Sequence, residues 1–430
     1  MRVISALSLI TALLAGQVAA APDKLIIAGQ LLDVRSGELH AEQAILLEHD
    51  RVHSIMPVAK LSAAQQALPR TDLSGYTVLP GLIDMHVHLT ANPAQHGYRR
   101  LQQTPARQAL FGVTAAQATL EAGFTTVRNL GAAGFADVDL RDAINAGEIS
   151  GPRMRVSGPS LCMTGGHCDN NLLPHIYQAS ADGVANGVDA IRAKVRSNMK
   201  YGADVIKFTA TGGVLSRNTD VNASQYSLAE MQALVEEAKD RGAIVAAHAH
   251  GLRGIKRALE AGVHSIEHAS FIDDDAIKLA KRNGSYLVMD IYVSDYILQE
   301  GEAAGILPES LAKERTVGQL QRQNFRKAVK AGLNIAYGTD AGVYTHGLNA
   351  RQFNYMVQWG MTPLQAIQSA TINAATLLNW RNEQGQLNVG VLQTGTYADM
   401  VAVKGNPLEQ ISLLENIPVV IKGGEVVKAG

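Results

Sequence analysis

The segment Leu82–Leu89 reads Leu-Ile-Asp-Met-His-Val-His-Leu and directly follows the pair Pro80-Gly81. Its apolar residues are typical of a buried β-strand, and the two histidines stand near the carboxyl end of that strand. Side chains in a strand alternate between its two faces, so His86 and His88 point to the same side. Two imidazoles on one face can reach a single ion. A His-x-His pair alone is weak evidence, but here it predicts half of a metal site at a strand end.

Four more apolar runs further along the chain end in residues that can bind or assist a metal ion. Charged and polar side chains at the ends of buried strands are costly unless they are paired or metal-bound. Their repetition therefore predicts one convergent site. The runs are Ala203–Lys207, which ends in Lys207; Ala243–His250, which contains His248 and His250; Ser265–His268, which ends in His268; and Asn334–Asp340, which ends in Asp340.

The composition fits a globular protein with a large core. The chain has 430 residues, of which 47% are hydrophobic, and its formal net charge is -1. The 38 basic and 39 acidic residues form no long block of either sign. We therefore expect no nucleic-acid partner, and no membrane partner is expected either.

Residues 1–20 are expected to form a secretory signal peptide. Arg2 precedes the apolar stretch Leu7–Ala15, and small residues follow it. The apolar stretch is too short to span a bilayer. A positive start, an apolar centre and an Ala-x-Ala-like end predict cleavage near Ala20 or Ala21. We therefore expect a secreted or periplasmic protein and exclude this segment from the fold.

The two cysteines, Cys162 and Cys168, lie in one predicted loop. In an exported protein two cysteines this close in a loop more often form a disulfide than remain free. Zinc binding by the pair is less favoured, because the chain has no second cysteine pair. We therefore favour a disulfide between them.

Strand-like apolar runs alternate with helix-like amphipathic runs through the middle of the chain, which predicts repeated strand–helix units and a parallel sheet. Eight such units predict an α/β fold, a (β/α)8 TIM barrel over residues 77–385, because candidate ligands on many strands converge only if the sheet closes. An open doubly wound sheet is less favoured, since no Gly-x-Gly-x-x-Gly follows the first strand. The strands are expected to end near His88, Leu130, Gly158, Lys207, Ala249, His268, Ile291 and Asp340.

Two helix starts and a second domain are also predicted. Ser227 and Glu230 form a capping-box pattern, and Thr362-Pro363 places a cap and a proline at another helix start. Residues 21–76 and 386–430 consist of short alternating runs with glycine turns, which predicts one small β-sheet domain built from both chain ends.

These motifs together resemble the metal-dependent amidohydrolase superfamily, in particular its imidazolonepropionase-like and Xaa-Pro-dipeptidase-like branch, which includes relatives that hydrolyse N-acyl amino acids such as ochratoxin. The resemblance covers nearly the whole chain after the signal peptide. It implies a (β/α)8 barrel with a binuclear metal centre, flanked by a β-sandwich formed from both termini. The matching motifs are Ile27–Val34, Val78–His88, Thr126–Gly131, Gly165–His167, Gly338–Ala341 and Gly395–Val401.

The resemblance implies a role for each residue at a strand end. His86 and His88 resemble the ligands of the more buried ion. His248 and His268 resemble the ligands of the second ion. Asp340 resembles the carboxylate of the eighth strand, which would hold metal and carry a proton between the bridging hydroxide and the leaving group.

Lys207 resembles a lysine that bridges both metals as a carbamate. A lysine ammonium is a cation and cannot bind a metal, whereas a desolvated amine stays neutral and can be carboxylated by carbon dioxide into a bidentate anion. The implied cofactors are therefore carbon dioxide and two divalent ions, with Zn²⁺ the default for histidine and carboxylate ligands.

His248 and His250 share a face, so either could bind the second ion. The family pattern favours His248, leaving His250 to contact substrate or to polarise the scissile carbonyl. Deaminases of the superfamily resemble one another in a His-x-x-Glu motif, but Gly251 stands three residues after His248. This departure makes deamination a less favoured interpretation, and the presence of Lys207 favours a two-metal hydrolase.

The resemblance implies hydrolysis of an amide bond in dipeptides or N-acyl amino acids by a metal-bridging hydroxide. An Xaa-Pro dipeptidase or carboxypeptidase is expected, and an aryl-acyl-phenylalanine such as ochratoxin remains open as substrate. One alternative is a cyclic amide or lactone hydrolase that resembles imidazolonepropionase. A catalytically silent periplasmic metal-binding protein is less favoured. The family also implies a homo-oligomer.

Loops after the strands supply the candidates for substrate contact. A tyrosine or arginine there could grip the carboxylate of a dipeptide or N-acyl amino acid. For most of these candidates a packing role is as well supported as substrate contact. For the histidine of the Gly-Gly-His motif, His167, a functional role is favoured. Arg128 is expected instead to pair with a nearby carboxylate. The candidates are His167, Arg217, Tyr226, Tyr292 and His346.

Overall fold

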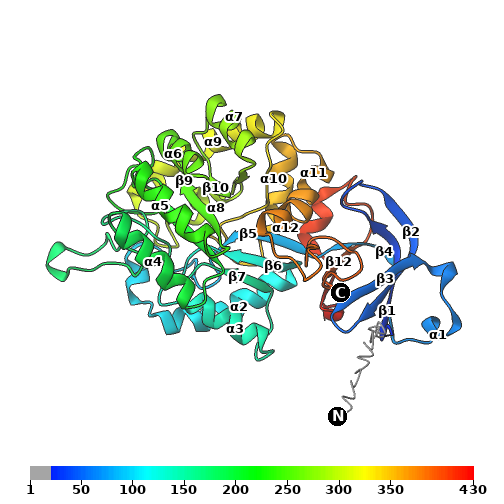
Figure 1. Ribbon diagram of the computed structural model, residues 1–430. Coiled ribbons are helices and arrows are strands. Elements are labelled where there is room, and N and C mark those ends of the chain that lie inside the picture. The colour runs from blue at the N-terminus through cyan, green and yellow to red at the C-terminus, as the bar shows by residue number, and fades with distance from the viewer. Residues whose placement is uncertain (1–20) are drawn as a thin grey trace, which may run out of the picture.

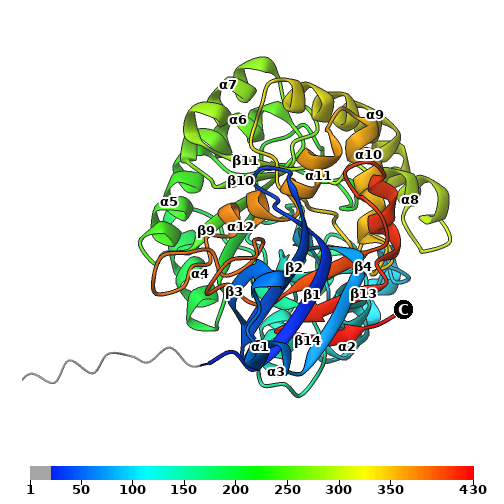
Figure 2. The ribbon, with the colours of Figure 1, turned by 90° about the vertical axis from the view of Figure 1, so that its right-hand side faces the viewer.

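The structure, a computed structural model, describes residues 21–430, so the expected signal peptide at residues 1–20 lies outside the described residues. A barrel of parallel strands is surrounded by helices, and a β-sheet built from both chain ends lies beside it (Figure 1, Figure 2). The predicted α/β fold class is therefore confirmed. Within residues 21–430, no helix has both the length and the apolar character needed to cross a bilayer.

Seven barrel strands are regular, and each is parallel to its neighbours in the barrel. Most of their residues are buried, as expected for a parallel sheet that is covered on both faces. The strands are β5 (Leu82–Val87), β6 (Phe124–Asn129), β7 (Arg153–Val156), β8 (Val205–Thr209), β9 (Ile244–Ala249), β10 (Ser265–His268) and β11 (Tyr286–Val288).

An irregular segment after β7 joins the two halves of the barrel. The backbone nitrogen of Leu161 donates to the carbonyl of Lys207 at 2.8 Å, and its carbonyl accepts from the nitrogen of Thr209 at 2.9 Å. These bonds attach the sheet of β5, β6 and β7 to the sheet of β8, β9, β10 and β11.

A segment occupies the position of the expected eighth strand, but it is not a regular β-strand. Residues 334–341 bond to both neighbours: the nitrogen of Met85 in β5 donates to Tyr337 at 2.8 Å, and Leu287 of β11 bonds to the same segment. The φ angle of Asp340 is 58°, in the left-handed region, so extended backbone cannot continue through that residue. At this segment the barrel is closed by individual backbone hydrogen bonds, without a continuous strand ladder.

Helices follow the strands and cover the outside of the barrel (Figure 1). Both predicted helix starts are confirmed, since Ser227 caps α5 and Thr362 caps α11 through their side chains. The α-helices are α2 (Pro105–Glu121), α3 (Ala136–Asn145), α4 (Val188–Lys200), α5 (Leu228–Lys239), α6 (Leu252–Ala261), α7 (Asp274–Asn283), α8 (Val293–Glu300), α9 (Pro308–Lys330), α10 (Gln352–Gln358), α11 (Pro363–Ser369) and α12 (Ile372–Leu378).

Short helical turns lie between these elements, and α1 (Ala63–Gln66) belongs to the sheet domain. The 3-10 turns are η1 (Val58–Lys60), η2 (Gly97–Gln102), η3 (His175–Tyr177), η4 (Asn349–Arg351) and η5 (Ile411–Asn416).

The composite domain is one continuous mixed sheet of seven strands in the order β14-β13-β12-β4-β1-β2-β3. Only β1 and β4 pair in parallel, and they carry a register shift between Ala28 and Gln30. The strands are β1 (Lys24–Leu32), β2 (Leu39–Glu48), β3 (Arg51–Pro57), β4 (Arg70–Pro80), β12 (Met400–Val403), β13 (Val419–Lys422) and β14 (Glu425–Lys428).

Gly81 is the single residue between β4 of this sheet, which ends at Pro80, and β5 of the barrel, which begins at Leu82. A Cβ atom at Gly81 would lie 2.1 Å from Oγ1 of Thr125, so the joint has no room for a side chain. The nitrogen of Gly81 donates to the carbonyl of Asp399 at 2.9 Å. The sequence before the His-x-His pair is therefore fixed by a close approach of backbone to β6.

A buried ion pair strengthens the same junction. Arg153 of β7 donates from Nε to Oδ2 of Asp399 at 2.8 Å and from Nη2 to Oδ1 at 3.1 Å. The guanidinium carbon also lies 3.5 Å from the ring centroid of Tyr397. A bidentate pair of this kind fixes both the distance and the orientation of the two parts.

We predict that Asp399→Asn destabilises the protein by about 2 kcal/mol, because it leaves the mostly buried Arg153 without its counter-charge. Thermal denaturation followed by circular dichroism should show a melting temperature lowered by several degrees. Asp275→Asn, which removes one member of an exposed pair with Lys278, should change stability by less than about 0.5 kcal/mol. Equal melting temperatures for Asp399→Asn and the parent protein would contradict this account.

Candidate metal centre

The first group of candidate ligands lies where β5 meets the closing segment. Oδ1 of Asp340 is 3.4 Å from Nε2 of His86 and 3.2 Å from Nε2 of His88. The two histidines therefore face the same side, as strand alternation predicts. Two ring nitrogens around one carboxylate oxygen form a donor set that suits a divalent cation.

The second group consists of three buried histidines at the ends of β9 and β10. Candidate ligand atoms of His248, His250 and His268 all lie within 4.8 Å of one another. The ring centroids of His248 and His268 are 4.6 Å apart, and those of His86 and His268 are 5.1 Å apart. The two groups therefore adjoin each other, as their positions at strand ends predict.

Lys207, in the middle of β8, lines the same cavity as these residues and is 3% exposed. Burial lowers the pKa of Lys207 to about 8, although the nearby carboxylates of Glu267 and Asp340 favour its charged form. More of this amine is therefore neutral near pH 7 than is usual for lysine.

Most of the buried imidazoles are neutral. Burial lowers the pKa of His86, His248 and His250 well below the usual value for histidine. A neutral imidazole has a free lone pair, which a metal ion requires. His268 is different: burial opposes its charged form, but the adjacent carboxylate of Asp290 outweighs burial and raises its pKa.

Two buried carboxylates support the histidines from behind. Oε2 of Glu267 lies 3.2 Å from Nδ1 of His86, and Oδ1 of Asp290 lies 2.9 Å from Nδ1 of His268. Arg128 donates from Nη2 to Oε1 of Glu267 at 2.8 Å, so its expected pairing with a carboxylate is confirmed. A carboxylate on the far nitrogen fixes the tautomer and orientation of a metal-binding histidine.

Sequence reasoning did not identify Glu267 or Asp290. Glu267 could have been found, because it directly precedes the candidate ligand His268 at a predicted strand end. Asp290 follows β11 after Met289, and no periodic pattern marks it. Its role depends on the neighbouring strand β10, which the chain order alone does not place.

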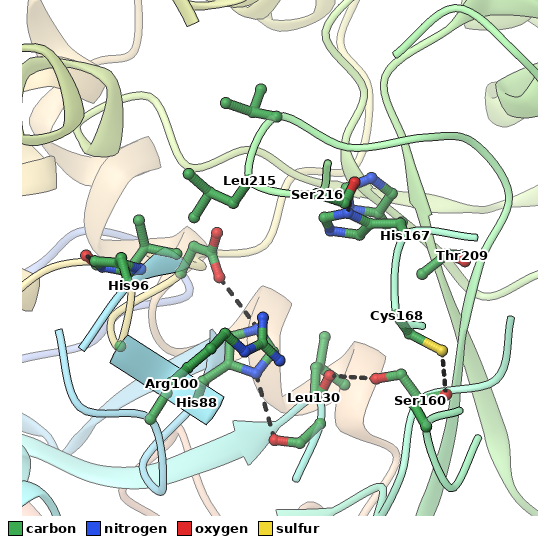
Figure 3. A pocket seen from close by; sticks show the side chains of 18 of the residues that line it. His88, His96, Arg100, Leu130, Ser160, His167, Cys168, Thr209, Leu215 and Ser216 are labelled. Carbon is green, nitrogen blue, oxygen red and sulfur yellow. Dashed lines mark hydrogen bonds and ion pairs between the residues drawn. The ribbon is translucent and has the colours of Figure 1, made fainter. Parts of the chain in front are cut away.

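The candidate ligands form the floor of a cavity of about 590 Å³, a size typical of small-molecule sites. His167 lines this cavity, and its ring stacks on that of His248 with centroids 4.2 Å apart. Nδ1 of His167 is 2.7 Å from Oγ of Ser216. Figure 3 shows His167 and Ser216 together on one side of the pocket, with His88 and Arg100 across from them.

Cys162 and Cys168 form a disulfide, as favoured from the sequence. Cys168 lines the cavity directly after His167. The backbone nitrogen of His167 donates to Oε1 of Gln225 at 3.0 Å. The bridge and this bond together restrain the loop that places His167 against the candidate ligand His248.

Arg217, another predicted substrate contact, also lines the cavity. Its Nη1 donates to the hydroxyl of Tyr98 at 2.5 Å, and its Nε lies 3.8 Å from a carboxylate oxygen of Glu309. The guanidinium of Arg217 therefore already has partners within the protein.

The other three predicted substrate contacts lie outside the cavity lining and serve in packing. The hydroxyl of Tyr226 donates to the carbonyl of Ala185 at 3.0 Å. Tyr292 packs edge-on against another tyrosine. Nε2 of His346 is 3.1 Å from the carbonyl of Ala91. Each side chain turns toward the protein interior, where burial of its ring is favourable.

We predict that Glu267→Gln weakens binding of divalent metal by about 10- to 100-fold, because the amide removes the negative charge that orients His86. Metal content after dialysis against graded chelator, measured by elemental mass spectrometry, tests this. Glu260→Gln, on the exposed face of α6, should retain metal like the parent. Unchanged metal retention by Glu267→Gln, with a native circular dichroism spectrum, would contradict the supporting role.

Known proteins share this architecture. The model of the Amidohydrolase family matches residues 77–427. Ochratoxinase from Aspergillus niger is 34% identical over 373 residues, which are 82% of this chain and 75% of that protein. A crystal structure of a Xaa-Pro dipeptidase with bound methionine is 39% identical, with a TM-score of 0.85 over 94% of this chain and 100% of that one. A prolidase complexed with N-methylphosphonate-L-proline is 31% identical, with a TM-score of 0.85 over 95% of this chain and 100% of that one. The chain therefore belongs to the amidohydrolase family, as a metal-dependent hydrolase that acts on C–N bonds.

Proposed function

We propose that this protein hydrolyses the amide bond of dipeptides or N-acyl amino acids and uses two divalent ions to do so. The observation that carries the proposal is the meeting of two histidine groups, a carboxylate and a buried lysine at the floor of one cavity. The names of the similar proteins, an ochratoxinase and two dipeptidases, support this class of substrate.

The donor set fits two such ions. His86, His88 and Asp340 would hold one ion, and His248 and His268 would hold the other. Imidazole nitrogens with carboxylate oxygens favour Zn²⁺ among the common divalent ions. When bound, the ions lower the pKa of a water molecule and polarise the scissile carbonyl.

Lys207 would bridge the two ions after reaction with carbon dioxide. Burial favours its neutral amine, which is the form that adds carbon dioxide. Addition of carbon dioxide, with loss of one proton from the amine to solvent, would give an anion with two oxygens that would offset part of the positive charge of the bound cations.

Asp340 and His250 supply the proton transfer and the orientation. Asp340 accepts a proton from the attacking water and delivers it to the amide nitrogen as that nitrogen leaves. Nδ1 of His250 is 2.7 Å from Oγ of Ser270, which fixes its ring and leaves Nε2 free to bond the carbonyl oxygen of the substrate.

The disulfide supports the proposal that the protein is secreted or periplasmic, because such bridges persist in oxidising compartments. His167, restrained by that bridge, would contact the bound substrate from above the metal cluster.

We predict that the zinc-loaded protein without its signal peptide releases amino acids from a panel of dipeptides and N-acyl amino acids that includes Xaa-Pro and aryl-acyl-phenylalanine members. Asp340→Asn should lower the rate at least about 100-fold, because it removes the proton carrier. Amino-acid analysis of the products tests this. If no compound of the panel is hydrolysed, the alternative of a cyclic amide or lactone substrate would be favoured.

A second prediction concerns Lys207. Isotopically labelled bicarbonate should give a carbamate carbon signal in the NMR spectrum of the parent protein and none in Lys207→Ala. Lys207→Ala should also lose most of its metal, because the bridging anion is missing. A short-chain carboxylate in the buffer should restore part of the activity by taking the place of that anion. A labelled carbamate signal of equal strength in Lys207→Ala would contradict the assignment.

A further inference from the structure

Among the charged side chains of the cavity that take no part in the proposed chemistry, Arg100 of η2 and Glu314 of α9 are the two considered for substrate binding. We propose that Arg100 binds the terminal carboxylate of the substrate and Glu314 binds a cationic group on its acyl side, so that unblocked dipeptides are preferred over N-acyl amino acids. This inference rests on the proposed amide hydrolysis and narrows its substrate class.

Arg100 carries a positive charge that no other side chain neutralises. Within residues 21–430 its guanidinium has no hydrogen bond and no ion pair. The side chain is exposed to the cavity, and the surrounding protein lowers its pKa. Its charge also acts on His96 and His167, whose rings line the same cavity. An unpaired guanidinium in such a place is suited to bidentate binding of a carboxylate.

The other cations of the cavity are already committed. Arg217 bonds to Tyr98 and lies near Glu309, and Lys207 belongs to the metal cluster. The free charge therefore singles out Arg100, in the turn after β5, and not Arg217, the arginine among the candidates from the sequence.

Glu314 is the corresponding free carboxylate. Its side chain is 3% exposed and lies against the cavity, where Ser294 donates a hydrogen bond to Oε1, and no side chain of residues 21–430 bonds Oε2. Burial raises the pKa of Glu314 to about 7, and the charge of Asp290 adds to this effect. A cationic group of a ligand would stabilise the charged form of this carboxylate.

The remaining carboxylates of the cavity have structural partners. Asp169 accepts backbone hydrogen bonds from Gly165 and Ala181, and Asp182 accepts one from Gly134. Asp290 and Asp340 contact candidate metal ligands. Asp182 is exposed, whereas Glu314 is buried, has an oxygen without a hydrogen bond and is not a candidate metal ligand.

The two charges come from different elements that line one cavity, Arg100 from η2 after β5 and Glu314 from α9. A dipeptide likewise carries one charge of each sign, with a carboxylate after the scissile bond and an ammonium before it. Charge complementarity of this kind gives specificity by leaving buried charges unpaired when the wrong ligand binds.

Three compounds separate the two subsites. Leu-Phe has both charges, isocaproyl-phenylalanine lacks the ammonium, and leucyl-phenylalaninamide lacks the carboxylate. The parent enzyme should hydrolyse Leu-Phe with a kcat/KM at least about tenfold above that for either analogue, as expected for loss of one charged hydrogen bond.

Matched variants assign each preference to a residue. Glu314→Gln should lower kcat/KM for Leu-Phe about tenfold and leave kcat/KM for isocaproyl-phenylalanine nearly unchanged. Arg100→Met should also lower kcat/KM for Leu-Phe about tenfold, and it should leave kcat/KM for leucyl-phenylalaninamide nearly unchanged. Controls are Glu300→Gln, at the exposed end of α8, and Arg107→Met, in the first turn of α2; both lie outside the cavity lining.

Two results would overturn this inference and leave the proposed function standing. One is hydrolysis of all three compounds at similar rates by the parent enzyme. The other is a variant whose kcat/KM falls equally for Leu-Phe and for the analogue paired with that variant. If the parent enzyme cleaves none of the three and none of the wider amide panel, the proposed function itself fails. A variant that does not fold leaves the comparison of the three compounds on the parent enzyme as the deciding measurement.

Discussion

The closing segment of the barrel, residues 334–341, is the constraint on which the site depends. Its hydrogen bonds to β5 bring Asp340 against His86 and His88, and its contact with β11 completes the ring of strands. The nitrogen of Asp340 donates to the carbonyl of His86 at 2.7 Å, although Asp340 has a left-handed φ of 58°. His268 shares this feature with a φ of 70°. Such conformations cost about 1 to 3 kcal/mol each and persist where surrounding contacts over-determine them.

Burial then decides the charge state of the cluster. Removing imidazoles from water favours their neutral form, which is the form that binds metal. The carboxylates behind them have a second effect, because each fixes which ring nitrogen remains free. Glu267 could not be buried behind His86 without the guanidinium of Arg128, since an unpaired carboxylate in this interior is strongly unfavourable. The pair therefore supports the site without taking part in its chemistry.

The regular parts of the fold could be predicted from the sequence, because strand alternation and helix caps are local properties. His86 and His88 share a face by the geometry of β5 alone, and Ser227 caps α5 through its own neighbours. Asp290 and Glu314 could not be assigned in the same way, since their roles depend on which element packs beside them. Tyr226, in turn, has the chemistry of a substrate contact, but its hydroxyl is used by the backbone at Ala185. Sequence shows which groups are present, whereas packing determines which of them remain free.

Arg100 and Glu314 lie on other elements than the candidate metal ligands. The candidate metal ligands lie on strands, at their carboxyl ends or in the segment that closes the barrel, so their mutual distances are set by backbone hydrogen bonds. The two free charges come from a short helical turn after β5 and from α9, outside the strands. A change of substrate charge can therefore be accommodated by residues of these outer elements without altering the metal cluster. The barrel determines the reaction, and the surrounding turn and helix determine which molecule is positioned for it.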